Sequence, residues 1–304
     1  MNLSTILFRF LVFPGLLFAV PAAWFYLWVE RKAMAKMQRR IGPPFMQPFF
    51  DFLKLMGKEV PARPGFSGFL MRTWPIFSVA AAAGACGLLP VIQSGAGFNG
   101  DLILLLSLLE VPSMFLIAAG FSSRSLWGEI GSAREATMNV AYNIVFLMAV
   151  IGIAVSQQTF SLQALAQSHG SILRWVAVLA ILVCLPAKLH MNPFSLTNAE
   201  QEIYAGPTTE YVGAELAMFE LAHGLEWVAA TGLVAVLMAP MIANPSAAAA
   251  VFVALSLLVV LVLTGIAAGT ARLAIDSSVR FYGQCALILI VIGVSSALLM
   301  RMKL

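Results

Sequence analysis

Long apolar runs separated by polar segments dominate the pattern of this chain. A membrane-spanning helix needs about 20 apolar residues in succession, and none of the runs alternates as the strands of a membrane β-barrel do. The pattern predicts eight spanning helices, at residues 5–28, 75–94, 102–121, 138–156, 172–190, 222–243, 246–268 and 284–301.

The first long polar segment contains a shorter, amphipathic pattern. Its apolar positions recur three and four residues apart, at Phe49, Phe52, Leu53 and Met56, and charged side chains fall on the other faces. This is typical of a helix in the membrane interface. We expect either a surface helix bound to lipid or the wall of an opening towards the cytoplasm.

Composition excludes an ordinary soluble domain. Of the 304 residues, 61% are hydrophobic and 11% are charged, whereas the charged fraction of soluble domains is roughly 25%. The sequence therefore predicts an all-α polytopic membrane protein that forms a single transmembrane domain over residues 1–304. Its three cysteines lie singly in apolar runs, without the spacing of metal ligands. We expect no metal and no cofactor on this chain.

The positions of lysine and arginine predict the orientation, because positively charged loops stay in the cytoplasm. With the N-terminus outside, 14 of the 18 basic residues lie inside, and only Arg9, Arg174, Arg301 and Lys303 lie outside. The cytoplasmic loops are then expected at about 30–74, 122–137, 190–221 and 270–283. The net charge of +4 reflects this orientation, and we expect no nucleic-acid binding.

The carboxylates are the most informative residues, since nine of the 14 fall between Glu110 and Glu226. Glu110 lies in the middle of a predicted span, where an ionised carboxylate costs at least about 2.5–3.5 kcal/mol to insert. It must be neutral, paired or hydrated, and it is a candidate for a functional site.

A second acidic pattern lies at the start of the sixth span. Glu220, His223 and Glu226 recur three residues apart and share one helix face. Carboxylates raise one another's pKa at low dielectric, and histidine titrates near neutrality. The stripe predicts a route for protons. The competing interpretation is that Glu215 and Glu220 only solvate the end of the helix.

Three further titratable residues leave alternatives open. Asp276 lies four residues from both Arg272 and Arg280, so it belongs either to a proton route or to an ion-pair array on a helix. His169 and His190 lie near the predicted ends of spans and are expected to be ordinary interface residues.

A rigid turn follows the first span. Gly42, Pro43 and Pro44 restrict the backbone there, since each proline fixes φ and removes an N–H donor. We expect this turn to hold Arg39 and Arg40 against a docked partner.

Five short motifs carry a family resemblance: Glu30-Arg31-Lys32, Arg40-Ile41-Gly42-Pro43, Gly131-Ser132-Ala133-Arg134-Glu135, Ala199-Glu200-Gln201-Glu202 with Gly206-Pro207-Thr208-Thr209-Glu210-Tyr211, and Ala271-Arg272-Leu273-Ala274-Ile275-Asp276. In order and spacing they resemble the membrane subunit of respiratory complex I that joins its peripheral and membrane arms. The resemblance covers nearly the whole chain. The first loop and Arg134-Glu135 look closer to the energy-converting group 4 [NiFe] hydrogenases and formate hydrogenlyases.

This resemblance implies a non-catalytic subunit in a prokaryotic inner membrane. Its cytoplasmic loops would anchor the hydrogenase module, and its buried glutamates would couple electron transfer to proton or sodium translocation. The implied partners are the hydrogenase large subunit with its [NiFe] centre, the small iron–sulfur subunit, a ferredoxin-like iron–sulfur subunit and antiporter-like membrane subunits. The [NiFe] centre and the iron–sulfur clusters are expected on those partners.

Two groups of candidate residues follow. The expected proton path comprises Glu110, Glu135, Glu200, Glu202, Glu210, Glu220, His223, Glu226 and Asp276. The expected docking residues are Arg39, Arg40, Gly42, Pro43 and Arg134.

The sequence departs from complex I relatives at three positions. Asn143 follows Tyr142 where relatives have a glutamate, so a path there would use Glu135 or water. Ser195 replaces a common aspartate, and His223 occupies a glutamate position.

Other functions stay open. A quinone-site-forming subunit of a complex I-type NADH:quinone oxidoreductase is the first alternative, and a stand-alone secondary ion transporter is the second. No internal repeat supports the transporter. An intramembrane enzyme lacks support, since the histidines are scattered and Asp51, Asp101 and Asp276 are isolated.

Overall fold

A computed structural model describes residues 7–91, 98–167, 172–196, 205–239, 242 and 244–302, with side chains as far as residue 293. Within these residues the chain forms helices and turns and no strand. The prediction of an all-α polytopic membrane protein is confirmed.

Seven helical segments in the described residues are long and apolar enough to span a membrane. They are the short π-helix η1 (Phe8–Val12) with α2 (Leu16–Met37), then α4 (Gly65–Leu88), α5 (Asp101–Ser122), α6 (Leu126–Ser156), α10 (Gly213–Met238), α11 (Pro245–Gly269) and α12 (Ile275–Met302). The fifth predicted span corresponds to α8 (Ile172–Lys188), which has 17 residues and begins directly after a segment outside the described residues. Shorter elements are α3 (Gln47–Met56), α7 (Leu162–Gln167) and the 3₁₀-helix η2 (Gly206–Thr208).

The helices differ from the predicted spans at their polar ends. The range 122–137, expected to be a loop, is helical except at 123–125, and α4, α10 and α12 begin about ten residues before the predicted spans. An apolar run marks only the part of a helix inside the bilayer, whereas the backbone ladder continues with polar side chains beyond it. The first run breaks instead at Phe13–Gly15, where Pro14 lacks an N–H.

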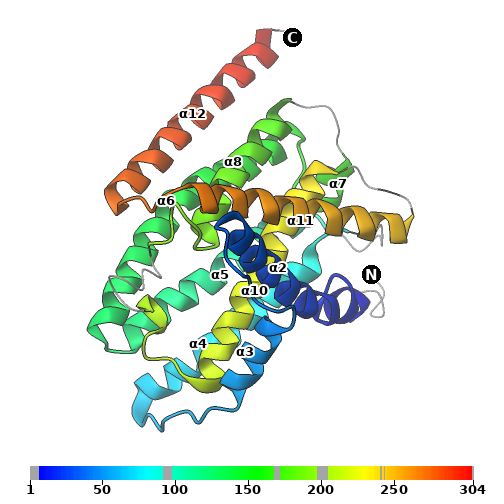
Figure 1. The fold of residues 1–304 in the computed structure, drawn as a ribbon. Helices are drawn as coiled ribbons and strands as arrows, with labels where there is room; N and C mark the ends of the chain where they lie inside the picture. The colour runs from blue at the N-terminus through cyan, green and yellow to red at the C-terminus, as the bar shows by residue number, and fades with distance from the viewer. Residues whose placement is uncertain are drawn as a thin grey trace.

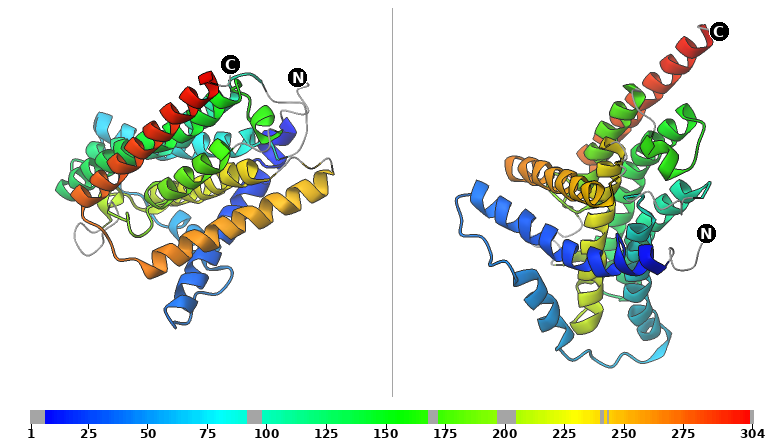
Figure 2. Two further views of the ribbon diagram at one scale, coloured as in Figure 1. Left: turned by 90° about the horizontal axis from the view of Figure 1, so that it is seen from above. Right: turned by 90° about the vertical axis from the view of Figure 1, so that its right-hand side faces the viewer.

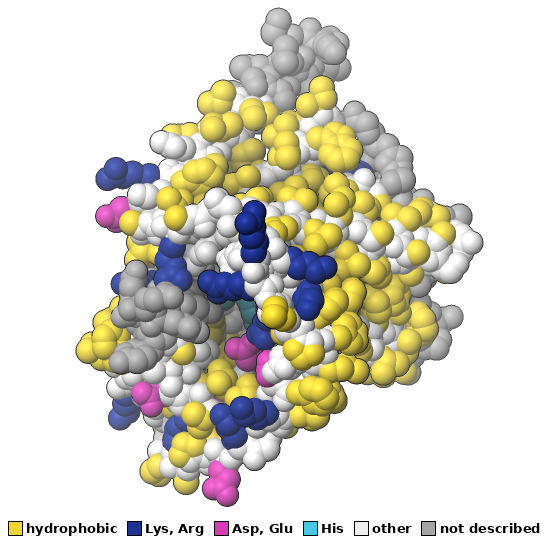
Figure 3. All heavy atoms as spheres, in the orientation of Figure 1, with side chains coloured by type: hydrophobic (Ala, Val, Ile, Leu, Met, Phe, Trp, Pro, Cys, Tyr) yellow, Lys and Arg dark blue, Asp and Glu magenta, His cyan; other side chains and the backbone are white. Residues whose placement is uncertain are grey.

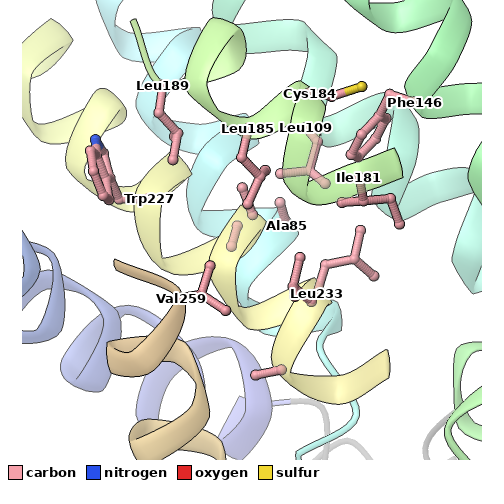
Figure 4. Close-up of a cluster of buried hydrophobic side chains, with 14 of the residues drawn as sticks. Ala85, Leu109, Phe146, Ile181, Cys184, Leu185, Leu189, Trp227, Leu233 and Val259 are labelled. Atoms are coloured by element: carbon pink, nitrogen blue, oxygen red, sulfur yellow. The ribbon is translucent and has the colours of Figure 1, made fainter. Parts of the chain in front are cut away.

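Helix α10 lies at the centre of the bundle, packed against α2, α4 and α11 (Figures 1 and 2). Large apolar side chains pack around it, among them Leu185 of α8 and Val259 of α11, and the same core continues through Leu109 of α5 to Phe146 of α6, which lies beside Ile181 of α8 (Figure 4). Helix α12 packs against α6, and its C-terminal part extends beyond the other helices (Figure 1). The core therefore encloses the element that carries the predicted acidic stripe.

The polar segments join the helices at one end of the bundle, which we call the basic end. It comprises residues 38–46, 57–64, 189–196, 205–212 and 270–274. Lys and Arg side chains gather there together with Asp and Glu, while hydrophobic side chains cover most of the rest of the visible face (Figure 3).

Two arginines at the opposite end have a structural role. Arg174 donates to the carbonyl oxygens of Leu237 at 2.6 Å and Leu165 at 3.0 Å, and Arg9 donates to Leu88 and Leu89, each at 3.3 Å. These carbonyls lie at helix C-termini, which lack intrahelical partners and carry partial negative charge. Cations on this side therefore cap helices.

Candidate functional site

A buried ion pair joins α5 to α8. The Nζ atom of Lys188 lies 2.9 Å from Oε1 of Glu110 and also donates to the Leu109 carbonyl oxygen at 2.8 Å. The Lys188 side chain is completely buried and that of Glu110 is 10% exposed. A lone charge here would be very costly, so each residue needs the other. The prediction that Glu110 must be neutral, paired or hydrated is resolved in favour of pairing.

Polar side chains of α6 complete this group. Asn143 donates from Nδ2 to Glu110 and, at 2.8 Å, to Oδ1 of Asn139. Asn139 in turn donates to the Tyr142 hydroxyl at 3.0 Å. We call Glu110, Asn139, Tyr142, Asn143 and Lys188 the lysine cluster. The amide at position 143 thus binds the carboxylate of the neighbouring helix, where a second glutamate would repel it.

A second buried group lies between α6, the end of α8 and α10. His190 Nε2 lies 3.1 Å from Oε1 of Glu135, and His223 Nδ1 lies 3.8 Å from Oε2 of Glu226. The two imidazole rings stack with their centroids 5.3 Å apart and their planes at 12°. We call Glu135, His190, His223 and Glu226 the histidine cluster.

The end of α8 aims His190 into this cluster. The Met191 N–H bonds to the Pro186 carbonyl at 2.7 Å and the His190 N–H to the Ala187 carbonyl at 3.2 Å. These are the two bonds of a Schellman motif, and His190 takes its left-handed position with φ of 53°. Glycine usually occupies that position, so the local backbone tolerates strain to place an imidazole there.

Electrostatics favour a charged His190. Burial lowers the pKa of His190, but the charge of Glu135 and its hydrogen bond raise it, and the resulting pKa is above the ordinary value. The expectation that His190 is an ordinary interface residue is therefore wrong: its side chain is 7% exposed and paired with a carboxylate.

Among the described residues, two cavities are lined by side chains of the histidine cluster, and a third adjoins them at Glu220. The largest, about 370 Å³, lies at the basic end and is lined by Glu30, Arg31, His190, Asn192, Ser195, Glu220, His223, Trp227 and Arg272, among others. A cavity of about 60 Å³ adds Ser113 and Glu226. A third, about 200 Å³, lies between α2, α3 and α10. Glu220 lines each of them, so it stands at their junction.

Helix α3 forms one wall of the third cavity. Phe49 and Phe52 pack on Trp24 with centroid separations of 5.0 and 5.8 Å, while Leu53 and Met56 stay about half exposed. Phe52 and Asp51 line the cavity, and Asp51 pairs with Arg31 at 3.3 Å. The sequence left open whether this helix binds lipid at the surface or forms the wall of an opening. Its inner face lines a cavity, which agrees with the second interpretation.

The predicted path residues fall into distinct places. Glu110, Glu135, His223 and Glu226 lie in the two clusters, and Glu220 lies at the cavities. Asp276 is exposed in the first turn of α12, and the Glu210 side chain is exposed. Glu200 and Glu202 lie outside the described residues.

The segment around Glu210 is held from the first loop. Arg63 donates to the Glu210 carbonyl oxygen and forms an ion pair with Glu215. Its guanidinium lies 5.9 Å from the centroid of the Tyr211 ring. Burial raises the pKa of the Tyr211 hydroxyl to about 12. Glu215, considered as a solvated helix end, is instead buried and paired.

The docking candidates sit on a braced turn at the basic end. Lys32 Nζ donates to the Gly42 carbonyl at 3.2 Å, and Trp28 Nε1 to the Pro43 carbonyl at 3.3 Å. Arg39 and Arg40 are exposed on this turn. Arg134 lies half-buried on α6.

Sequence reasoning missed Lys188, Asn139, Tyr142 and Trp227. Lys188 is a charged residue inside the predicted span 172–190, but it lies near the end of that span, whereas Glu110 lies in the middle of its own. The others carry no such signal, since their partners are set by packing between helices. In the described residues no group of three or more His, Cys, Asp or Glu side chains is arranged to hold a metal ion.

Residues 10–298 match the NADH dehydrogenase family. The chain is 30% identical over 244 residues to a subunit of the NADH-quinone oxidoreductase of Salinibacter ruber, covering 75% of this chain and 70% of the relative. This chain belongs to the NADH dehydrogenase subunit 1 family. Its fold also matches a chain of the membrane-bound sulfane sulfur reductase, an archaeal respiratory membrane complex, with TM-score 0.87 and 28% identity over 96% of this chain and 99% of that one.

Membership of the NADH dehydrogenase subunit 1 family makes this chain a membrane subunit of a complex I-like respiratory complex. Both relatives belong to complexes of several subunits, which is consistent with partner subunits here. The alternative of a stand-alone transporter therefore has no support. In this family member, the lysine cluster and the histidine cluster are polar groups in the interior of one subunit of a larger complex.

Proposed function

We propose that this chain is the membrane subunit of an energy-converting [NiFe] hydrogenase complex. It docks the hydrogenase and iron–sulfur subunits at its basic end and couples their electron transfer to the movement of protons. The docking half rests on the braced Arg39–Pro43 turn and on motifs similar to the hydrogenase branch. The basic end then faces the cytoplasm, because loops rich in Lys and Arg are retained there.

The coupling half rests on one observation: two buried titratable clusters continue inward from a polar cavity at the docking end. His190 and His223 line that cavity, and Glu135 and Glu226 lie directly behind them. The Tyr142 hydroxyl is within electrostatic reach of Glu110, Glu135 and Glu226. A series of exchangeable groups therefore leads from the polar cavity to Glu110. Water is able to occupy the smaller cavity that His190, His223 and Glu226 line.

The electron acceptor differs between the relatives. One relative is named for quinone and the other for sulfane sulfur. The same type of membrane subunit thus serves different redox partners. Docking and ion coupling are the roles that do not depend on the acceptor.

Purification of the intact complex tests the hydrogenase assignment. A tagged chain should retain a large subunit with two CxxC pairs for nickel, and the complex should evolve hydrogen from a reduced iron–sulfur donor. Retention of quinone-reducing activity without hydrogen evolution would contradict the proposal. Changing Arg39 and Arg40 together to Glu should release the redox subunits, whereas the same change at Lys54 on α3 and Arg72 on α4, both exposed and outside the basic end, should not.

The quinone alternative is favoured by the third cavity, where Trp24, Leu27 and Phe52 form an apolar wall beside Glu220. A quinone needs an apolar channel for its tail and polar partners for its ring, and this cavity adjoins the polar one. Leu27→Trp would fill the boundary between them. It should abolish quinone reduction if that is the activity, and leave hydrogen evolution intact if it is not.

A further inference from the structure

His223 contacts a donor that restricts its protonation. The indole Nε1 of Trp227, one helical turn later on α10, donates to His223 Nε2 at 3.2 Å. Trp227 is 2% exposed, so losing this bond would leave a buried indole N–H without a protein partner. An indole has one N–H and no acceptor, and the nitrogen that receives it must present a lone pair.

The position of the remaining proton on His223 follows. A neutral imidazole carries one N–H, so with Nε2 accepting, the hydrogen is on Nδ1. Nδ1 faces Glu226 Oε2 at 3.8 Å and has no hydrogen-bond partner among the described residues; Oε1 of Glu226 has none either. A small side-chain rotation closes this gap and makes His223 a donor to the Glu226 carboxylate.

The stacked pair holds at most one extra proton. Two imidazolium rings with centroids 5.3 Å apart would repel strongly in a buried site. A charged His223 would carry a second N–H directed at the indole N–H and would lose the Trp227 bond. His190 faces the Glu135 carboxylate and gains from its charge. The charged groups around the pair are Glu220 and Glu226 on α10, Glu30 and Arg31 on α2, Glu135 on α6, Lys188 on α8 and Arg272 after α11.

We propose that Trp227 is a positioning residue that locks His223 as a neutral hydrogen-bond donor to Glu226, so that His190 alone of the stacked pair carries protons. The inference rests on the proposed proton route and changes the expected role of His223 within it. A proton leaves the imidazolium of His190 from Nε2 towards Glu135, and His190 returns to neutrality. No proton crosses His223, because its only open nitrogen already holds one.

Substitution by glutamine distinguishes a histidine that carries protons from one that only forms hydrogen bonds. Its amide offers one acceptor and a donor, as the neutral His223 ring does, but it does not titrate. In membrane vesicles with the intact complex, we compare proton uptake per electron pair in His223→Gln, His223→Ala and His190→Gln. His223→Gln should retain at least about tenfold more uptake than His190→Gln, in line with the usual effect of a positioned proton-transfer group. His223→Ala should lose coupling, and Gln should rescue it.

The nitrogen NMR chemical shifts of labelled histidine report whether each ring nitrogen is protonated, and a change of packing alone does not imitate that signal. In the wild-type complex, His223 should show a single tautomer, with Nδ1 protonated and Nε2 unprotonated. Trp227→Phe keeps the ring packing but removes the donor, so the signal of a protonated Nε2 should then appear. The matched control is Trp74→Phe on α4, which removes an indole N–H without a partner among the described residues.

The possible outcomes distinguish a failure of the inference about His223 from a failure of the proposed proton route. Equal loss of uptake in His223→Gln and His190→Gln, or a wild-type signal of protonated His223 Nε2, would overturn the inference while leaving the route in place. Full coupling in both His190→Gln and Glu226→Gln would overturn the proposed route, and the inference with it. Retention of the partner subunits in each variant shows that the chain has folded.

Discussion

The sequence shows each charged residue inside the bundle but does not show which residue it pairs with. Glu110 stands out in its apolar run, but its partner Lys188 lies 78 residues away and is brought close by the packing of α5 and α8 against α6. The same holds for His190, whose burial depends on the turn that ends α8. Sequence reasoning therefore found Glu135 and Glu226 as candidates and did not find how they pair.

Lys188→Met should destabilise the protein strongly. The change leaves Glu110 buried without its counter-ion, and breaking a buried pair in this way costs about 3–5 kcal/mol. Thermal unfolding of the detergent-solubilised complex measures the loss. Glu110→Leu combined with Lys188→Met removes both charges and should recover most of the stability. A double variant as unstable as the single one would contradict this description of the pair.

The His190–Glu135 pair should make stability depend on pH. The pKa of His190 is raised in the folded protein, so the folded state holds a proton that the unfolded state releases above about pH 6.5. The added stability is fully present below that pH and is lost as the pH rises through the raised value. Unfolding of the wild type and of His190→Gln, followed against pH, should converge at high pH. A difference that grows with pH would have the wrong sign.

At the scale of elements, the apolar runs located the spanning helices well and their ends poorly. The pattern at Phe49–Met56 predicted α3, because amphipathic spacing depends on local sequence alone. The polar extensions of α4, α6 and α10 were not predicted, because polar residues at a helix end and in a loop have similar composition. What fixes these ends is contact between segments, such as Arg63 with Glu215.

One such contact depends on a glycine of α6. A Cβ at Gly131 would lie 2.6 Å from Cα of Gly206, so the segment before α10 approaches the helix too closely for any side chain. Gly131→Ala should therefore destabilise the basic end by about 1–3 kcal/mol and weaken retention of partner subunits. Gly152→Ala on the same helix meets nothing within 4 Å and serves as the control. Its stability should be unchanged or slightly raised, since alanine favours helix.

At the scale of the whole molecule, the two ends of the bundle differ in charge. Basic residues gather at one end, and two arginines at the other end cap helix C-termini. The acidic residues lead from the basic end into the core, through Glu220, Glu135 and Glu226 towards Glu110. The sequence predicted this gathering of acids along the chain. Their division between the lysine cluster and the histidine cluster depends on the three-dimensional packing of α5, α6, α8 and α10, which the sequence does not show.

The central claim is that Glu110 is a member of the path that couples electron transfer to proton movement. The direct measurement is the number of protons taken up per electron pair by vesicles that contain the intact complex with Glu110→Gln. Glu129→Gln, which changes an exposed glutamate in the first turn of α6, is the control. Because Glu110→Gln leaves Lys188 buried without its counter-ion, uptake is counted per complex that retains its redox subunits. We expect Glu110→Gln to lower this uptake at least about tenfold and Glu129→Gln to match the wild type. Wild-type proton uptake in Glu110→Gln would contradict the account.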